Sequence, residues 1–415
     1  MAVCPVYQIT SREFDAPRGR LALLETMADA VGQSHRFEEI LSRCLMCGAC
    51  AKVCANSVET TSVIQKGRHR VFEQRKGLRA SSLLAGGIRE EELSGKILSK
   101  GGALLQALFC KTIPESSGLH LRFPLRFFTQ RQTMPPISWT SFMREFQGKT
   151  VTGSGEKRVG FFVGCGANYL FPETAWSLVR ILQKFGVTVV VPEDQVCCGL
   201  PAFVSGDTKK AQALAKRNLE AFKGLDLDAV VTVCASCGSH LEGLEALFDD
   251  DSSWQGRARA LANKHRDAMA FLVGDVGFED YLKGRKDAEE DRSDDILRVA
   301  YHDPCHLRIG QGITNVPRKF LGALPGVELA EAPHKDLCCG HGGDFNLSHF
   351  DLSMDILDRR MKDFKKVAPD VIVTGCTGCL IQFAEGVSRC GLAGTTQVLH
   401  PLVLAERALV SSRLM

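Results

Sequence analysis

The sequence predicts a multi-domain α+β protein, in which an N-terminal α-helical domain precedes two copies of one α/β domain with a mostly parallel sheet. Two observations lead to this fold class. From about residue 157 onward, short apolar runs of strand type alternate with helix-forming segments, which is typical of βαβ units. A five-cysteine pattern also occurs there twice, with corresponding cysteines 140 to 142 positions apart (165 to 305, 197 to 338, 234 to 376). So regular an offset indicates an internal duplication.

Four segments follow from these signals along the chain. We expect a helical, cysteine-rich domain at residues 1–75, with a helix-like stretch from Arg20 to Leu41. The connector at 76–156 is expected to be helical at first and irregular from residue 110, where prolines recur. The two α/β copies are expected at 157–285 and 296–408, on either side of an acidic polar linker at 286–295.

Each copy repeats one plan of strands and helices. In the first copy, apolar and β-branched runs predict strands, and helical periodicity predicts helices: strands at 159–163, 187–191 and 229–233, helices at 173–185 and 208–225. In the second copy the expected strands are 297–301 and 371–374, and the expected helices 316–324 and 347–364. Several cysteines directly follow a predicted strand, at the sheet edge where open α/β folds place their sites.

Composition excludes several classes of protein. The net charge of +3 and the lack of a dense basic run argue against a nucleic-acid partner. No apolar stretch approaches the roughly 18 residues of a membrane-spanning helix, and residues 1–11 lack the regions of a signal peptide. We therefore expect a cytoplasmic protein; the basic stretch 66–79 leaves a peripheral place on the inner membrane face open, although a solvated helix face is the simpler interpretation. Seventeen cysteines in such a chain favour metal or redox chemistry over disulfides.

The sequence carries no other recognisable cofactor motif. It contains no Gly-rich phosphate loop, no dinucleotide fingerprint with its acidic partner and no nucleophile elbow. We therefore expect no FAD or NAD site on this chain, and the sequence identifies no catalytic residue.

A run of four cysteines near the N-terminus has the C-x2-C-x2-C-x3-C spacing of bacterial ferredoxins: Cys44, Cys47, Cys50 and Cys54. In proteins with two clusters, the fourth cysteine of such a run binds the other 4Fe–4S cluster. A chance match or a zinc site is the weaker alternative.

Cys4, followed by Pro5, resembles the end of a second run of this kind. By the same rule Cys4 would complete the cluster of Cys44, Cys47 and Cys50, and Cys54 would belong to a second cluster whose other ligands this chain lacks. We therefore expect the printed sequence to start at an internal methionine, with the N-terminal domain truncated; an upstream reading frame without C-x2-C-x2-C would contradict this. The alternative is that Cys4 is a free thiol on a frayed terminus.

Each copy of the duplicated pattern brings together five thiolates, more than the four ligands that zinc usually takes. Adjacent cysteines are also hard to direct at one tetrahedral ion, so the pattern favours a larger iron–sulfur cluster, with zinc in one of the two sites as the alternative. The expected ligands are Cys165, Cys197, Cys198, Cys234 and Cys237 in the first copy, and Cys305, Cys338, Cys339, Cys376 and Cys379 in the second.

Both copies resemble the cysteine-rich CCG domain, C-x(31–39)-C-C-x(35–36)-C-x2-C, with intervals of 31 and 35 residues in the first copy and 32 and 36 in the second. A ferredoxin-type domain before two CCG domains resembles the glycolate oxidase iron–sulfur subunit family, related to lactate-utilisation and heterodisulfide reductase subunits. The segments 15–20 (DAPRGR), 301–306 (YHDPCH) and 374–380 (TGCTGCL) are similar to that family too. The resemblance implies 4Fe–4S clusters, of non-cubane form at the CCG sites in the heterodisulfide reductase branch.

The resemblance also implies a function. We expect an electron-transfer subunit of a 2-hydroxyacid (glycolate or lactate) dehydrogenase complex, which takes electrons from a partner flavoprotein that binds FAD. A quinone, a further iron–sulfur protein or a membrane protein would accept them. Two alternatives stay open: a heterodisulfide-reductase-like subunit whose CCG clusters reduce a disulfide, and a zinc-stabilised scaffold.

Five other residues lie outside these groups or beside them. Cys110 and Cys390 belong to no group and are expected to be small buried hydrophobic residues. His302, His306 and His341 flank the second site, and hydrogen bonding or packing is the favoured interpretation over ligation or proton transfer.

Overall fold

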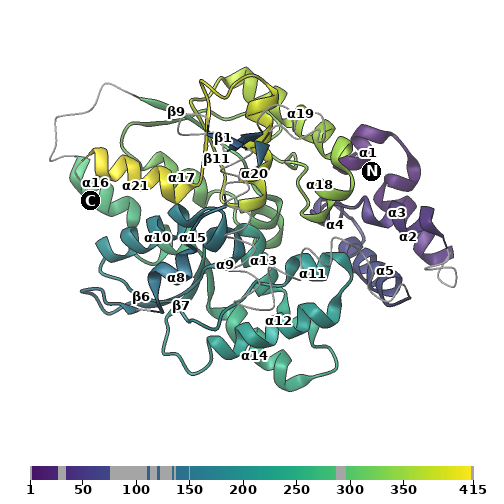
Figure 1. Ribbon diagram of the computed structural model, residues 1–415, viewed down its shortest axis with the longest axis horizontal. Coiled ribbons are helices and arrows are strands. Elements are labelled where there is room, and N and C mark those ends of the chain that lie inside the picture. Colours follow the sequence, from purple (N-terminus) through teal and green to yellow (C-terminus); the bar gives the residue numbers. More distant parts are fainter. Residues whose placement is uncertain are drawn as a thin grey trace.

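A computed structural model describes residues 2–26, 34–74, 110–112, 119–121, 133–134, 137–148, 150–286 and 296–412. The predicted fold class is confirmed: a helical N-terminal domain is followed by two α/β units with mostly parallel sheets. In Figure 1 the N-terminal helices form one end of the molecule and lie beside α18 and α19 of the second unit.

The N-terminal domain consists of short helices. They are α1 (Pro5–Thr10), the 3-10 helix η1 (Glu13–Asp15), α2 (Pro17–Thr26), α3 (His35–Ser42), α4 (Ala49–Lys52) and α5 (Thr60–Gln74). The expectation of one helix-like stretch from Arg20 to Leu41 is wrong. Ser34 has an extended backbone, and its hydroxyl accepts a hydrogen bond from the Phe37 amide, so it starts a new helix as an N-cap.

The first α/β unit is built on a five-stranded sheet in the order β4-β6-β5-β7-β8. Its strands are β4 (Thr150–Val151), β5 (Arg158–Phe162), β6 (Thr188–Val190), β7 (Ala229–Thr232) and β8 (His265–Asp267). All pairs are parallel except β4 with β6. The helices are α8 (Phe142–Phe146), α9 (Gly164–Tyr169), α10 (Pro172–Lys184), α11 (Leu200–Ser205), α12 (Thr208–Ala221), α13 (Ala235–Glu242), η4 (Leu244–Leu247), α14 (Ser252–Lys264), α15 (Ala268–Gly274) and α16 (Phe278–Lys286).

The second unit has a four-stranded parallel sheet in the order β10-β9-β11-β12. Its strands are β9 (Leu297–Tyr301), β10 (Val327–Leu329), β11 (Val371–Val373) and β12 (Gln397–Leu399). Its helices are the π-helix η5 (His306–Gly310), α17 (Val316–Gly322), α18 (Asp344–Ser348), α19 (Phe350–Val367), α20 (Thr377–Arg389) and α21 (Pro401–Ser411). The order 2-1-3-4 matches strands β6-β5-β7-β8 of the first unit, so the duplication in the sequence is also a duplication of topology.

The two units share one hydrophobic core. Residues from both sheets and from the helices between them belong to a single continuous buried cluster. Phe278 of α16 stacks on Phe320 of α17 with ring centroids 4.6 Å apart, and α10 packs on α21. Burial of apolar surface therefore holds the two copies together as one body.

The structure differs from the expectations at several elements. The predicted helix 347–364 is interrupted at His349, between α18 and α19, and strands β8, β10 and β12 were not predicted. Part of the connector that was expected to be irregular forms an antiparallel sheet of β1 (Cys110–Thr112), β2 (Leu119–Leu121) and β3 (Thr133–Met134). The linker at 286–295, apart from Lys286 in α16, lies outside the described residues, as does the side chain of Cys110.

Among the helices that the structure describes, none combines the length and the apolar character that crossing a membrane requires.

Candidate metal centres

Three cysteines of the ferredoxin-type run and Cys4 line one cavity in the N-terminal domain. Cys44, Cys47 and Cys50 come from the loop before α4 and from α4 itself, and Cys4 lies immediately before α1. Burial, with a smaller contribution from Cys338, raises the pKa of the Cys47 thiol well above its ordinary value; burial and Cys44 raise the pKa of the Cys50 thiol. Four thiols that face one cavity provide the donor set of a 4Fe–4S cluster.

A polar cluster from the segment 15–20 supports this site. The buried Arg20 donates hydrogen bonds to the carbonyls of Ile40 and Arg43, and its Nη1 lies 4.0 Å from Cys4 Sγ. Asp15, fully buried, lies 3.4 Å from Arg43 and 3.8 Å from Arg20. The positive charge of Arg20 therefore lies beside a sulfur of the cavity.

Cys54 lies apart from this cavity. It is half-buried after α4, its Sγ accepts a 3.5 Å hydrogen bond from the Val58 amide, and it does not line the cavity of the other four cysteines. The structure thus groups Cys4 with the run's first three cysteines, which is the arrangement that cross-ligation predicts.

The first five-cysteine site lies at the carboxyl edge of the first sheet. Cys165 follows β5 on α9, and the pair Cys197-Cys198 precedes α11. Cys234 follows β7 as the N-cap residue of α13, and Cys237 is one turn further in that helix. The sulfurs of Cys165 and Cys197 are 4.0 Å apart. Hydrogen bonds with Cys237 and with Cys376 of the second copy hold the pKa of Cys234 well below its ordinary value.

The second site repeats this arrangement. Cys305 follows β9 before η5, Cys338-Cys339 precede α18, and Cys376 after β11 is the N-cap residue of α20, which contains Cys379. The sulfurs of Cys339 and Cys379 lie 3.2 Å apart. The described geometry therefore brings together all five predicted cysteines in each copy.

The pKa values of the paired thiols indicate that the sites require a positively charged ligand. A hydrogen bond with Cys305 holds the pKa of Cys338 well below its ordinary value, whereas that bond and burial raise the pKa of Cys305 well above it. In the same way, a hydrogen bond with Cys234 raises the pKa of Cys376 to about 12. Five buried thiolates repel one another, so they ionise together only around a polycation. Soft thiolates in this number fit an iron–sulfur cluster.

Each five-cysteine site places a hydroxyl group beside a sulfur of the other site. Ser236, within the first site's Cys-x-x-Cys segment, lies with its Oγ 3.3 Å from Cys376 Sγ of the second site. Thr377, within the second site's segment, lies with its Oγ1 3.3 Å from Cys234 Sγ of the first. Each site therefore has a hydroxyl from the other copy at hydrogen-bond distance from one of its sulfurs.

The second site also adjoins the N-terminal cavity. A small apolar cluster contains Cys4 and Cys47 together with Cys338 and Cys305. A Cβ on Gly48, in the ferredoxin-type run, would lie 3.0 Å from Ile309 of η5. The three cysteine groups thus form a continuous series, in which the second site lies between the N-terminal cavity and the first site.

The three histidines near the second site differ in their partners. His306 Nδ1 hydrogen-bonds with Ser236 Oγ at 2.8 Å, and His341 Nδ1 accepts a hydrogen bond from the Gly343 amide. The ring nitrogens of His302 have no hydrogen-bond partner among the described residues, although the ring is buried. Cys390 is half-buried at the end of α20 and packs against the core.

Sequence reasoning missed the residues that act between the groups. Ser236 and Thr377 are small hydroxyl residues inside the two Cys-x-x-Cys segments, and this position was the only signal available. Asp15 and Arg20 belong to the segment 15–20 that resembles the family, but the sequence does not show their pairing, because burial of a charged pair is not visible in a sequence.

Comparisons with known proteins agree with this geometry. Residues 159–242 and 299–384 match the family model "Cysteine-rich domain", and residues 1–58 match "4Fe-4S dicluster domain". A "Probable glycolate oxidase iron-sulfur subunit" of Bacillus subtilis (strain 168) is 30% identical over 404 residues, which is 96% of this chain and 89% of that protein.

Two further relatives carry other descriptions. "Lactate utilization protein A" of Geobacillus kaustophilus is 30% identical over 56% of this chain and 93% of that protein. A subunit of the fumarate reductase (CoM/CoB) of Methanothermobacter marburgensis is 28% identical over 98% of this chain and 70% of that protein.

Proposed function

We propose, since the chain belongs to the glycolate oxidase iron–sulfur subunit family, that it is the electron-transfer subunit of a dehydrogenase complex for glycolate or lactate. A partner flavoprotein that binds FAD would oxidise the 2-hydroxyacid, and a quinone or another acceptor would take the electrons from this chain. The observation that carries the proposal is the continuous series of three cysteine groups across the molecule.

The ligand sets proposed for this function are those that the geometry groups together. Iron–sulfur clusters would supply one-electron redox chemistry at these sites. The protein holds the sulfurs at strand ends and helix N-termini, excludes water by burial and places polar hydrogens beside them. We assign Cys4, Cys44, Cys47 and Cys50 to one 4Fe–4S cluster and five cysteines to each CCG site, and we assign Cys54 to none of these groups.

The order of the groups predicts which sites an electron would pass. The second CCG site adjoins both other groups. The N-terminal cysteines Cys4 and Cys47 share an apolar cluster with Cys305 and Cys338 of the second CCG site, and no apolar cluster of the described residues joins them to the first CCG cysteines. An electron that crosses the whole chain would therefore pass through the second CCG site.

Reduction by a substrate-loaded flavoprotein tests the proposal. Anaerobically purified protein is mixed with an FAD-binding glycolate or lactate dehydrogenase subunit, and the hydroxyacid is added while iron–sulfur absorbance and low-temperature EPR are followed. We expect bleaching that depends on both flavoprotein and hydroxyacid. Cys339→Ser, which removes a ligand of the middle cluster, is the control. It should interrupt the path, so that only the cluster on the side where the electrons enter, the N-terminal cluster or the first CCG cluster, is still reduced. No reduction of any cluster by the complete mixture would contradict the proposal.

A second candidate function is reduction of a disulfide substrate. Two complete five-cysteine sites in direct contact favour it, since a simple electron carrier does not require both, and the similarity to a fumarate reductase (CoM/CoB) component points the same way. Release of thiols from a supplied disulfide by the dye-reduced protein would establish this function. Zinc without iron or acid-labile sulfide in the protein would instead support the scaffold alternative.

A further inference from the structure

The two CCG sites differ at the residue three positions before the first cysteine of each set. With the offset of 140 positions, His302 of the second copy corresponds to Phe162 of the first. Both side chains are almost completely buried, with 1% of their surface exposed. The second site thus has an imidazole where the first has a hydrocarbon ring.

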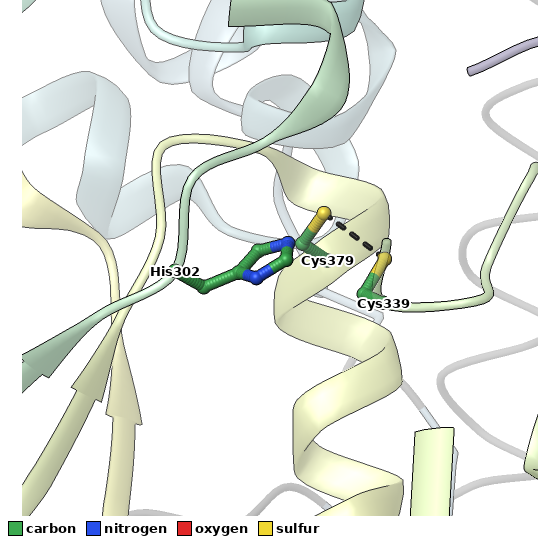
Figure 2. Close-up of side chains that lie close together, drawn as sticks. All are labelled: His302, Cys339 and Cys379. Carbon is green, nitrogen blue, oxygen red and sulfur yellow. Dashed lines mark hydrogen bonds between the residues drawn. The ribbon is translucent and has the colours of Figure 1, made fainter. Parts of the chain in front are cut away.

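The imidazole of His302 is directed at two cysteines of the second site. One of its ring nitrogens and the sulfurs of Cys339 and Cys379 all lie within 4.8 Å of one another. Figure 2 shows the ring pointing from the loop after β9 toward these two sulfurs. Its backbone amide donates to the Val373 carbonyl at 2.9 Å, and its ring packs edge-on against Phe383 with centroids 4.7 Å apart. Backbone and ring are therefore both held in place.

A buried polar group of this kind requires a partner. Neither ring nitrogen of His302 has one among the residues that the structure describes, and buried polar groups in folded proteins are nearly always hydrogen-bonded. An imidazole carries at least one N–H in either protonation state, so the ring has a hydrogen-bond donor to offer.

We propose that the N–H of His302 donates a hydrogen bond to a sulfur of the cluster at the second CCG site and raises the midpoint potential of that cluster above that of the first. This inference rests on the proposed cluster occupancy. Hydrogen bonds to cluster sulfurs stabilise the more negative, reduced form, so they raise the potential. Donation is the role we assign because five thiolates already supply the ligands. The second site, in the middle of the series, then retains electrons more strongly than the first.

A substitution that copies the first site tests the proposal. In His302→Phe the second site acquires the residue of the first, and His302→Gln keeps an N–H donor of similar reach. Redox titration followed by EPR reports the potential of each CCG cluster, and Cys165→Ser and Cys339→Ser assign the signals to the first and second site. We expect His302→Phe to lower the reduced fraction of the second cluster at a fixed potential about tenfold, which is about 59 mV for one electron. His302→Gln should restore part of this shift, and the first cluster should not change.

Several results would overturn the proposal. An unchanged second potential in an iron-replete His302→Phe protein shows that the ring does not act on the cluster. Loss of iron from both variants, or a nitrogen coupling in pulsed EPR as strong as that of a metal ligand, shows that His302 is a ligand instead. If His302→Phe does not fold, pulsed EPR of the wild-type protein decides: a weak nitrogen coupling with an exchangeable proton supports donation, and the lack of both contradicts it. A wild-type protein without iron at the second site defeats the proposed function as well, whereas a site with iron and no shift defeats this inference alone.

Discussion

At the scale of single residues, two hydroxyls connect the duplicated sites. Ser236 and Thr377 occupy different positions within their Cys-x-x-Cys segments, yet each lies 3.3 Å from the first cysteine of the other copy's segment. Ser236 Oγ also lies 2.8 Å from His306 Nδ1. The environment of each site is therefore partly determined by the other copy.

Because each hydroxyl lies beside a cysteine of the other copy, its removal should change the cluster of that other copy. Ser236→Ala removes the hydroxyl beside Cys376 and should lower the midpoint potential of the second CCG cluster, while Thr377→Val should lower that of the first, because each loses a hydrogen bond to sulfur. The measurement is an EPR-monitored redox titration of both clusters. Thr377→Ser, which keeps the hydroxyl, is the matched control and should stay close to wild type. A shift of the cluster in the same copy as the substitution would contradict the crossed assignment.

A second prediction separates Cys4 from Cys54. Cys4→Ser removes a thiol that lines the cavity with Cys44, Cys47 and Cys50, so it should decrease the iron content by about one cluster or leave an incomplete one. Cys54→Ser changes a half-buried thiol outside that cavity and should keep the cluster of the other four cysteines. Iron and acid-labile sulfide analysis with EPR distinguishes the two variants. Equal loss of the same EPR signal in both would show that Cys54 belongs to the same site.

At the scale of elements, the turn between each cysteine pair and its following helix requires glycine. Gly199 and Gly340 both have left-handed backbones, with φ of 98° and 90°. The two glycines differ in the room for a side chain. A Cβ on Gly340 would lie 2.7 Å from the Ser353 carbonyl oxygen in α19, whereas a Cβ on Gly199 would lie 3.4 Å from the Ala211 carbonyl oxygen in α12.

We therefore expect unequal costs for one substitution at the two turns. Gly199→Ala should lower the free energy of unfolding by about 1–2 kcal/mol, the usual cost of a left-handed backbone with a Cβ. Gly340→Ala should cost about 2–4 kcal/mol, because the contact with α19 is added. Denaturant unfolding of the two variants measures both values. Equal costs would show that α19 moves away without resistance.

At the scale of the whole molecule, both copies share one core, and the buried histidines within it make stability depend on pH. Burial lowers the pKa of His240 and of His400 to about 4. His400 Nδ1 accepts from the Leu402 amide at the start of α21, and its Nε2 donates to the Val233 carbonyl of the other copy at 2.7 Å. Protonation of His400 keeps the bond to Val233, which connects the two copies, but removes the lone pair that accepts from the Leu402 amide at the start of α21.

Acidification should therefore destabilise the fold. In the unfolded chain these histidines take up protons near pH 6.5, whereas in the folded protein they do so only near pH 4, so the free energy of unfolding falls as pH falls through this window. Each group accounts for about 3 kcal/mol over the full window. Denaturant unfolding between about pH 7 and about pH 5 measures the slope, and His400→Gln should make it less steep. A variant with the wild-type slope would show that His400 does not contribute.

Local sequence patterns were sufficient for much of the architecture. The strand predicted at 297–301 coincides with β9, and the helices predicted at 173–185 and 208–225 correspond to α10 and α12 within a few residues. These segments carry strong apolar patterns and clear boundaries. The short strands β8, β10 and β12 are three residues each and have no pattern of their own, so only pairing with a neighbouring strand defines them.

By itself the sequence determined the fold class, the duplication and the cysteines that gather in each copy, because spacing along the chain and alternation of strands and helices are local properties. The tertiary structure decided what lies between these groups. It joined the two copies through one core, placed the second CCG site next to the N-terminal cavity, and brought Ser236 and Thr377 to the sulfurs of the opposite copy. It also showed that His302, and not His306 or His341, faces two cysteines without another partner among the described residues. Such contacts join residues far apart in the sequence, and their geometry depends on how the whole chain packs.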